Sequence, residues 1–175
     1  MIMKSKNQGG ITMKNNKGLT LLELIIAIAI VFILVAIAVP AYLGQQKRAA
    51  RTEAFTNLET LRLLEEQFFS ENARYTINLG AAGDTVAVRD ANINDIQDTP
   101  NAHPPDALRG FRPGTGSNFS VRTIQNQALT TPVAAPWGGA QAAQTPCFIA
   151  VATGITGTRV AGDVFAIDCN NNKNF

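Results

Sequence analysis

The longest pattern in the sequence is an apolar run that begins directly after Glu23. Residues 24–39 read LIIAIAIVFILVAIAV without a polar side chain, and the next charged residue is Lys47. As a helix, residues 24–44 would extend roughly 31 Å, close to the roughly 30 Å thickness of the hydrocarbon core of a bilayer. The run therefore predicts a membrane-spanning helix.

Beyond this run, the hydrophobic pattern becomes that of an amphipathic helix. Residues 45–69 contain neither Pro nor Gly, and apolar residues recur there at spacings of three and four. Charged residues, Glu65 among them, are assigned to the other faces. We expect one helix over residues 20–70, kinked at Pro40, because the proline ring removes a backbone hydrogen bond and crowds the preceding turn. The apolar stripe expected to pack on a sheet consists of Ala50, Ala54, Leu58, Leu61, Leu64 and Phe68.

Short strand patterns follow the helix, separated by stretches rich in Gly and Pro. Residues 85–88 (TVAV) predict one short strand within an ordered loop over residues 76–117, and residues 117–124 alternate like a second strand. Residues 125–146 predict a further loop. Together with the long helix, these patterns predict an α+β fold with a small antiparallel sheet.

The last two strand patterns predict a hairpin centred on Thr158. Residues 147–153 and 163–169 are both strand-like, and folding them about Thr158 places Cys147 opposite Cys169. The chain has two cysteines, and both lie beyond the apolar run, so we expect a disulfide if this part is exported. The other pairs expected on the same face are Ile149 with Ile167 and Val151 with Phe165.

Charge adds a topology to this picture. The net charge is +2, but residues 1–18 hold four lysines and no acid, which leaves 11 basic against 13 acidic residues beyond them. Lysines ahead of the run favour a cytoplasmic N-terminus. A secretory signal cleaved after Ala38 stays open as an alternative. A nucleic-acid partner has only weak support, because three arginines more often lie on a solvated surface than in a binding patch. These arginines are Arg109, Arg112 and Arg122.

The residues before the apolar run carry a specific motif. Residues 17–23 read KGLTLLE, with charge, Gly, apolar residues and Glu at fixed spacing. With their apolar tail they resemble the class III leader and N-terminus of type IV prepilins and of their pseudopilin relatives. The likeness covers residues 14–45 and continues more loosely through residues 68–75 (FFSENARY). It implies a pilin-like fold, with a long kinked N-terminal helix packed on a small antiparallel sheet and a C-terminal disulfide loop.

The resemblance also implies processing. In this family a membrane peptidase cuts after the glycine and the new N-terminus is methylated, which here means cleavage between Gly18 and Leu19 and methylation of Leu19. Many relatives have Phe at this position. Met13 is an alternative start, since it would give the short leader MKNNKG that such proteins often carry. The implied organisation is a cleaved leader over residues 1–18, a transmembrane and assembly half of the helix over 19–44, and a periplasmic or extracellular globular domain over 45–175.

Glu23 is the predicted assembly residue. An ionised acid at the centre of a bilayer costs roughly 2.5–3.5 kcal/mol on insertion scales, and less near the interface. After cleavage, the α-amine of Leu19 lies one helical turn away and is cationic near neutral pH. Pairing of the two charges, within a subunit or between neighbours, would offset the burial cost and fix the register of packed helices. The alternative is a simple anchor whose Glu23 sits among lipid headgroups.

These features predict a structural subunit of a type IV pilus or pilus-like filament. The expected partners are the prepilin peptidase, identical and related pilins, and the assembly platform and motor, with the inner membrane as the location before assembly and an extracellular or periplasm-spanning filament afterwards. A type II secretion pseudopilin stays open as an alternative, although the disulfide favours a pilin. A single-span anchored binding module, whose loops over residues 76–146 hold a ligand, also stays open. No enzyme, cofactor or metal site is expected, since His103 is the single histidine and the two cysteines are expected to pair.

Overall fold

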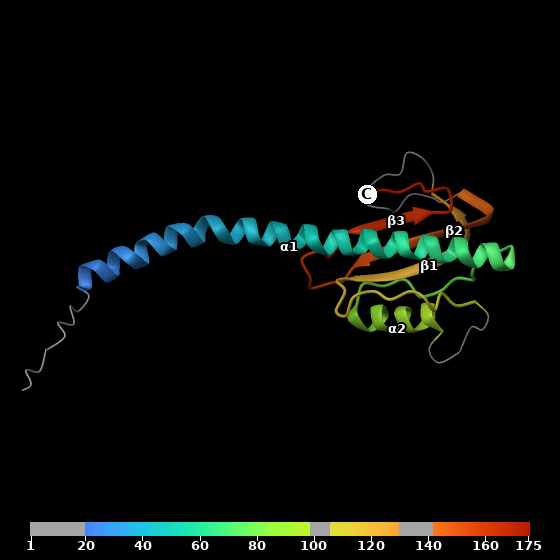
Figure 1. Cartoon of the computed structure of the whole chain (residues 1–175), viewed down its shortest axis with the longest axis horizontal. Coiled ribbons are helices and arrows are strands. Elements are labelled where there is room, and N and C mark those ends of the chain that lie inside the picture. The colour runs from blue at the N-terminus through green and yellow to red at the C-terminus, as the bar shows by residue number, and fades with distance from the viewer. Residues whose placement is uncertain (1–19, 99–105, 130–141) are drawn as a thin grey trace, which may run out of the picture. The chain divides into compact units, whose positions relative to one another are not determined.

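The computed structural model describes residues 20–98, 106–129 and 142–175 (Figure 1). The chain divides into two compact units, Met1–Tyr42 and Leu43–Phe175. Its elements, in order, are α1 (Leu21–Asn72), α2 (Val86–Gln97), β1 (Phe119–Ala128), β2 (Ala142–Gly154) and β3 (Val164–Asp168).

Helix α1 confirms the long helix expected over residues 20–70. It contains 52 residues and begins directly after Thr20. The hydroxyl of Thr20 accepts a hydrogen bond from the backbone N–H of Glu23 at 3.2 Å, and so caps a donor that has no partner in the first turn. Pro40 lies inside the helix, and a kink at this position stays a prediction.

In the second unit, α1 buries the apolar stripe that its sequence pattern predicts. Figure 1 shows this half of the helix running across the three strands, and its stripe shares one hydrophobic core with the facing strand residues. Leu64 lies at the edge of that core and is half-buried. The buried members of the stripe are Ala50, Ala54, Leu58, Leu61 and Phe68.

The sequence pattern places Glu65 on a polar face of the helix, and this prediction is wrong. Glu65 lies four residues after Leu61 and three residues before Phe68, so helical spacing carries it onto the buried stripe. Its side chain is completely buried in the structure.

The three strands form an antiparallel sheet in the order β1-β2-β3, which confirms the strands expected over 117–124, 147–153 and 163–169. The loop expected over 125–146 is shorter than the pattern suggests, because β1 continues to Ala128 and β2 begins at Ala142. Residues 130–141 lie outside the described residues.

Helix α2 corrects the strand expected over residues 85–88 and the loop expected around it. Thr85 is the N-cap of this helix, and its hydroxyl accepts a hydrogen bond from the N–H of Val88 at 3.3 Å. The alternation of TVAV therefore reflects a cap followed by the first helical turn. The helix packs against β1, where Asn92 Nδ2 donates to Ser120 Oγ at 3.1 Å and Ile96 is completely buried.

The predicted hairpin register is wrong by one residue. Ile149 pairs with Asp168 rather than with Ile167, and Val151 pairs with Ala166 rather than with Phe165. Alternation fixes a register only where one face of a strand is polar. Residues 148–152 of β2 are buried on both faces, one against the core under α1 and the other in a second apolar cluster, so the hydrophobic pattern fits either register.

Candidate functional site

The described part of the first unit is the beginning of α1, and its surface is almost wholly apolar. Every residue from position 21 to position 42 is exposed, and Phe32 and Ile37 each expose 71% of their surface. Side chains of this kind gain about 1.5–3 kcal/mol each when they are fully removed from water. The segment is long and apolar enough to cross a membrane, so its surface suits a lipid or a protein environment.

Glu23 is positioned by the first turn of α1. It is the third residue after the cap Thr20, and this Thr-x-x-Glu spacing is that of a capping box. A carboxylate in the first turn also lies near the positive end of the helix dipole. The structure thus holds the acid at the very start of the apolar segment, where it can meet a cation that approaches the helix end.

The structure does not describe the predicted cleavage site or the residue predicted to be methylated. Gly18 and Leu19 lie outside the described residues, as does Met13. Cleavage between Gly18 and Leu19, and pairing of the Leu19 amine with Glu23, therefore stay predictions.

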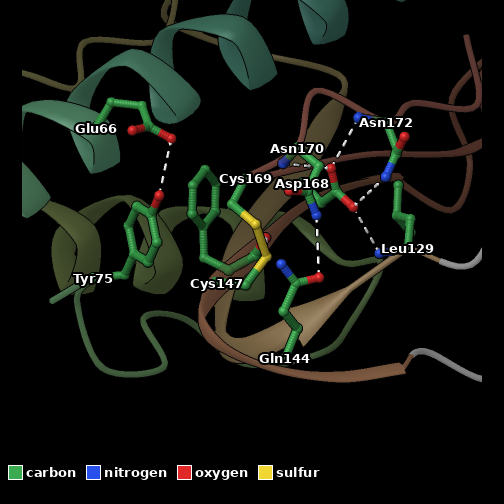
Figure 2. Close-up of a disulfide and its surroundings, with 10 residues drawn as sticks. Glu66, Tyr75, Leu129, Gln144, Cys147, Asp168, Cys169, Asn170 and Asn172 are labelled. Atoms are coloured by element: carbon green, nitrogen blue, oxygen red, sulfur yellow. Dashed lines mark hydrogen bonds between the residues drawn. A yellow bond between two sulfur atoms is a disulfide. The ribbon is translucent and has the colours of Figure 1, made fainter.

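The expected disulfide is present. Cys147 and Cys169 are bonded, with their Cα atoms 5.3 Å apart (Figure 2). The bond does not join directly opposed residues of the ladder, because β3 ends at Asp168, which faces Ile149. Cys169 follows that last pair, and its N–H donates to the carbonyl of Phe148 at 3.2 Å. The pairing of the cysteines is confirmed although the register that suggested it is not.

Asp168 organises the loop that carries Cys169. Its completely buried carboxylate accepts four hydrogen bonds, which Figure 2 shows converging from both sides. Three come from the Asn170 N–H at 2.9 Å, the Asn172 N–H at 2.8 Å and Asn172 Nδ2 at 3.0 Å. The fourth, from the Leu129 N–H at 2.9 Å, ties the C-terminal loop to the residue after β1.

An ion pair connects α1 to the start of β3. Arg51 donates two hydrogen bonds to Asp163, from Nε at 2.8 Å and from Nη2 at 2.9 Å, and Lys47 approaches the same carboxylate at 3.8 Å. The hydrogen bonds from Arg51 lower the pKa of Asp163 below its ordinary value. This contact holds the end of the β2–β3 connection against the helix.

Two of the three arginines considered for nucleic acid form hydrogen bonds within the fold. Arg109 donates to Asp98 at 2.8 Å, and Arg112 donates to the carbonyl of Phe111 at 2.9 Å. Arg122 lies on β1, where partial burial lowers the pKa of its guanidinium. Two of the three cations are therefore engaged by groups of the same chain.

Three polar residues with structural roles escape the sequence analysis, and each has a signal in retrospect. Thr20 belongs to the Thr-x-x-Glu capping pattern. Glu65 shares the helical spacing of the buried stripe. Asp168 accepts from the backbone N–H two residues later, as the side chains of aspartates in turns do.

Comparison with known proteins identifies the N-terminal part of the chain. The family model described as "Prokaryotic N-terminal methylation motif" matches residues 13–39. The chain is 48% identical over 61 residues, 35% of its length, to the type IV major pilin protein PilA of Myxococcus xanthus. It is 41% identical over 69 residues, 39% of its length, to the type IV wide pilus major component PilA4 of Thermus thermophilus. It is 35% identical over 80 residues, 46% of its length, to the fimbrial protein EcpC of Eikenella corrodens.

These matches cover 28%, 53% and 52% of the three relatives, so the chain spans between about a quarter and about half of their length. No solved structure matches the chain. The rest of the assignment comes from the fold, in which a long N-terminal helix, a three-stranded antiparallel sheet and a C-terminal disulfide occur together. With the methylation motif at the start of that helix, the chain is similar to type IV pilins in its N-terminal sequence and in its fold.

Proposed function

We propose that this chain is a structural subunit of a type IV pilus filament, without a catalytic role. The observation that carries the proposal is the bare apolar surface of α1 between residues 21 and 42, with Glu23 at its start and the methylation motif around it. Its relatives are named as major pilins and a fimbrial protein, which supports a pilus rather than a secretion pseudopilus.

The apolar surface dictates two successive environments. Before assembly the segment lies in the inner membrane, with the lysine-bearing N-terminus in the cytoplasm. In the filament the same segment packs against the equivalent segments of neighbouring subunits, so its side chains stay out of water. Residues 45–175 form the globular domain, first in the periplasm and then on an extracellular or periplasm-spanning filament.

Processing creates the charge that assembly uses. Prepilin peptidase cuts between Gly18 and Leu19, the Leu19 amine is methylated, and the resulting cation lies within reach of Glu23 on its own helix or on a neighbour. A lone carboxylate among apolar helices is unfavourable, and a charge-assisted hydrogen bond to the amine offsets that penalty. The partners are therefore the peptidase, further pilin subunits, and the assembly platform and motor that move subunits out of the membrane.

Two measurements test this proposal. The mature protein should begin at methylated Leu19 by N-terminal mass analysis. The variants Glu23→Ala and Glu23→Gln, each expressed alongside wild type, should remain in the membrane and enter sheared filaments roughly tenfold less often, since a loss of about 1.4 kcal/mol per contact changes an equilibrium tenfold. Glu71→Gln is the matched control, because Glu71 is an exposed acid on the same helix.

Each alternative predicts a different result. Normal incorporation of Glu23→Ala would contradict the assembly role of this acid. A mature N-terminus after Ala38 would indicate an ordinary secretory signal instead. A processed protein that is strictly monomeric and stays with the cell would indicate a membrane-anchored binding module.

A further inference from the structure

The second unit contains a buried acid that filament assembly does not use. Glu65 projects from α1 into the core, and its side chain is completely buried. One carboxylate oxygen accepts a hydrogen bond from the N–H of Thr76 at 3.1 Å, and the other accepts one from the Thr76 hydroxyl. The hydroxyl of Thr123, on β1, faces the same carboxyl group and is itself buried.

This cluster lies where the segment after α1 joins the edge of the sheet. Leu79 and Thr123 exchange two backbone hydrogen bonds, at 3.2 Å and 2.9 Å, so an isolated antiparallel bridge joins the end of residues 73–79 to the free edge of β1. Thr76 and Thr123 are each only 1% exposed. Glu65 therefore contacts both sides of this seam from within the core.

The surroundings of Glu65 suit a neutral acid. Among the described residues, no cationic side chain forms an ion pair with it. The ionisable groups that face it are Asp106, a like charge held by Arg74, and Tyr75, whose hydroxyl donates to Glu66. Burial and, to a smaller extent, the charge of Asp106 raise the pKa of Glu65 to about 7, against the opposing effect of the threonine hydrogen bonds. The pKa of Tyr75 is raised to about 12, chiefly by burial, so Tyr75 is neutral over this range.

Asp168, another completely buried acid, has a different set of hydrogen-bond partners. Asp168 accepts four hydrogen bonds from N–H groups, three of them on the backbone. Glu65 accepts from one backbone N–H and one hydroxyl, both of Thr76. A hydroxyl can donate to a carboxylate or accept from a carboxylic acid, so the Glu65 site keeps its hydrogen bonds in the protonated form while avoiding a buried charge.

We propose that Glu65 is a proton-dependent latch that holds residues 73–79 against β1 when it is neutral and releases this seam when it ionises. The direction of the pH effect follows because protonation of Glu65 and closure of the seam are thermodynamically linked. The acid is harder to ionise in the closed state than in the open state, where it has its ordinary pKa of 4.5. The latch is therefore fully closed below that ordinary value and loosens as the pH rises toward 7. The seam would open more readily in neutral or alkaline solution than in acid.

Native-state hydrogen exchange on the full chain in detergent micelles tests the latch. After correction for intrinsic exchange rates, the opening constant of peptides covering residues 73–80 and 119–125 should rise about a hundredfold between pH 5 and pH 8, as expected for a pKa that falls from about 7 to 4.5 on opening. In Glu65→Gln, which keeps the shape and loses the titration, this opening should be independent of pH. Glu71→Gln changes an exposed acid of the same helix and should keep the wild-type dependence.

A second measurement covers the case in which Glu65→Gln does not fold. Carbon-13 NMR of glutamate side chains in the wild type should show one carboxyl group that titrates near pH 7. Wild-type opening that stays constant from pH 5 to pH 8 would overturn the latch. So would the same pH dependence in Glu65→Gln as in wild type, or a Glu65 carboxyl group that is already ionised at pH 5.5.

Discussion

Reduction of the Cys147–Cys169 disulfide should destabilise the second unit by about 3 kcal/mol. The two cysteines are 22 residues apart in sequence. In the chain-entropy model, closing a loop of this length removes about 11 cal/mol/K from the unfolded chain, or about 3 kcal/mol at 25 °C. The folded state should change little, because the four hydrogen bonds to Asp168 hold the loop in place independently of the sulfur–sulfur bond.

Urea unfolding of the full chain in detergent micelles, with and without a phosphine reductant, measures this difference. With a slope of about 2 kcal/mol per molar urea, the midpoint should fall by about 1.5 M on reduction. Reduction leaves both sulfur atoms in the core, so loss of packing does not contribute. This matters because Cys147 is completely buried.

A cycle of alanine variants separates the cross-link from packing. Either Cys147→Ala or Cys169→Ala alone removes the covalent bond, so each single variant should lose most of the stability that the double variant loses. Costs that simply add in the double variant would show that packing, and not loop closure, is responsible. An oxidised and a reduced wild type with the same midpoint would refute the entropic argument.

Three further predictions concern the same unit. Leu58→Ala removes a completely buried side chain from the centre of the helix stripe and should cost about 3 kcal/mol in the free energy of unfolding, whereas Leu63→Ala, at an exposed position of α1, should cost far less in the same urea titration. Thr85→Ala removes the cap of α2 and should cost about 1 kcal/mol, with Thr85→Ser close to wild type by thermal unfolding. Because folding raises the pKa of Glu65 from 4.5 to about 7, the neutral acid stabilises the fold fully below pH 4.5, and this contribution is lost as the pH rises through 7. The free energy of unfolding should therefore fall by about 3 kcal/mol between pH 4 and pH 8, and Glu65→Gln should abolish this pH dependence.

The long helix and its buried face could be predicted from the sequence because the pattern there has one interpretation. Residues 45–69 contain no helix breaker, and their apolar period fits a helix and not a strand. The apolar run before them is too long for a globular helix. Both signals depend on many residues, so no single exception could reverse them.

Local patterns of four to seven residues were less decisive. TVAV at residues 85–88 alternates like a strand, but the hydroxyl of Thr85 caps a helix, and nothing in four residues separates these outcomes. The prediction of the β2–β3 register was wrong for a related reason. With apolar residues on both faces of β2, the position of the turn and the hydrogen bonds of Asp168 choose the register, and neither is encoded in the alternation.

Glu23 and Glu65 show why the candidate site could be located while its partner could not. Both are acids among apolar residues of α1, and both face the same unfavourable transfer of a charge out of water. Glu65 is enclosed by its own fold, so burial raises its pKa, and the Thr76 hydroxyl can hydrogen-bond to the neutral form. Glu23 has no such enclosure, because the helix around it is exposed on every side. The partner that we propose for Glu23, the Leu19 amine created by cleavage, could act only after the subunit has been processed.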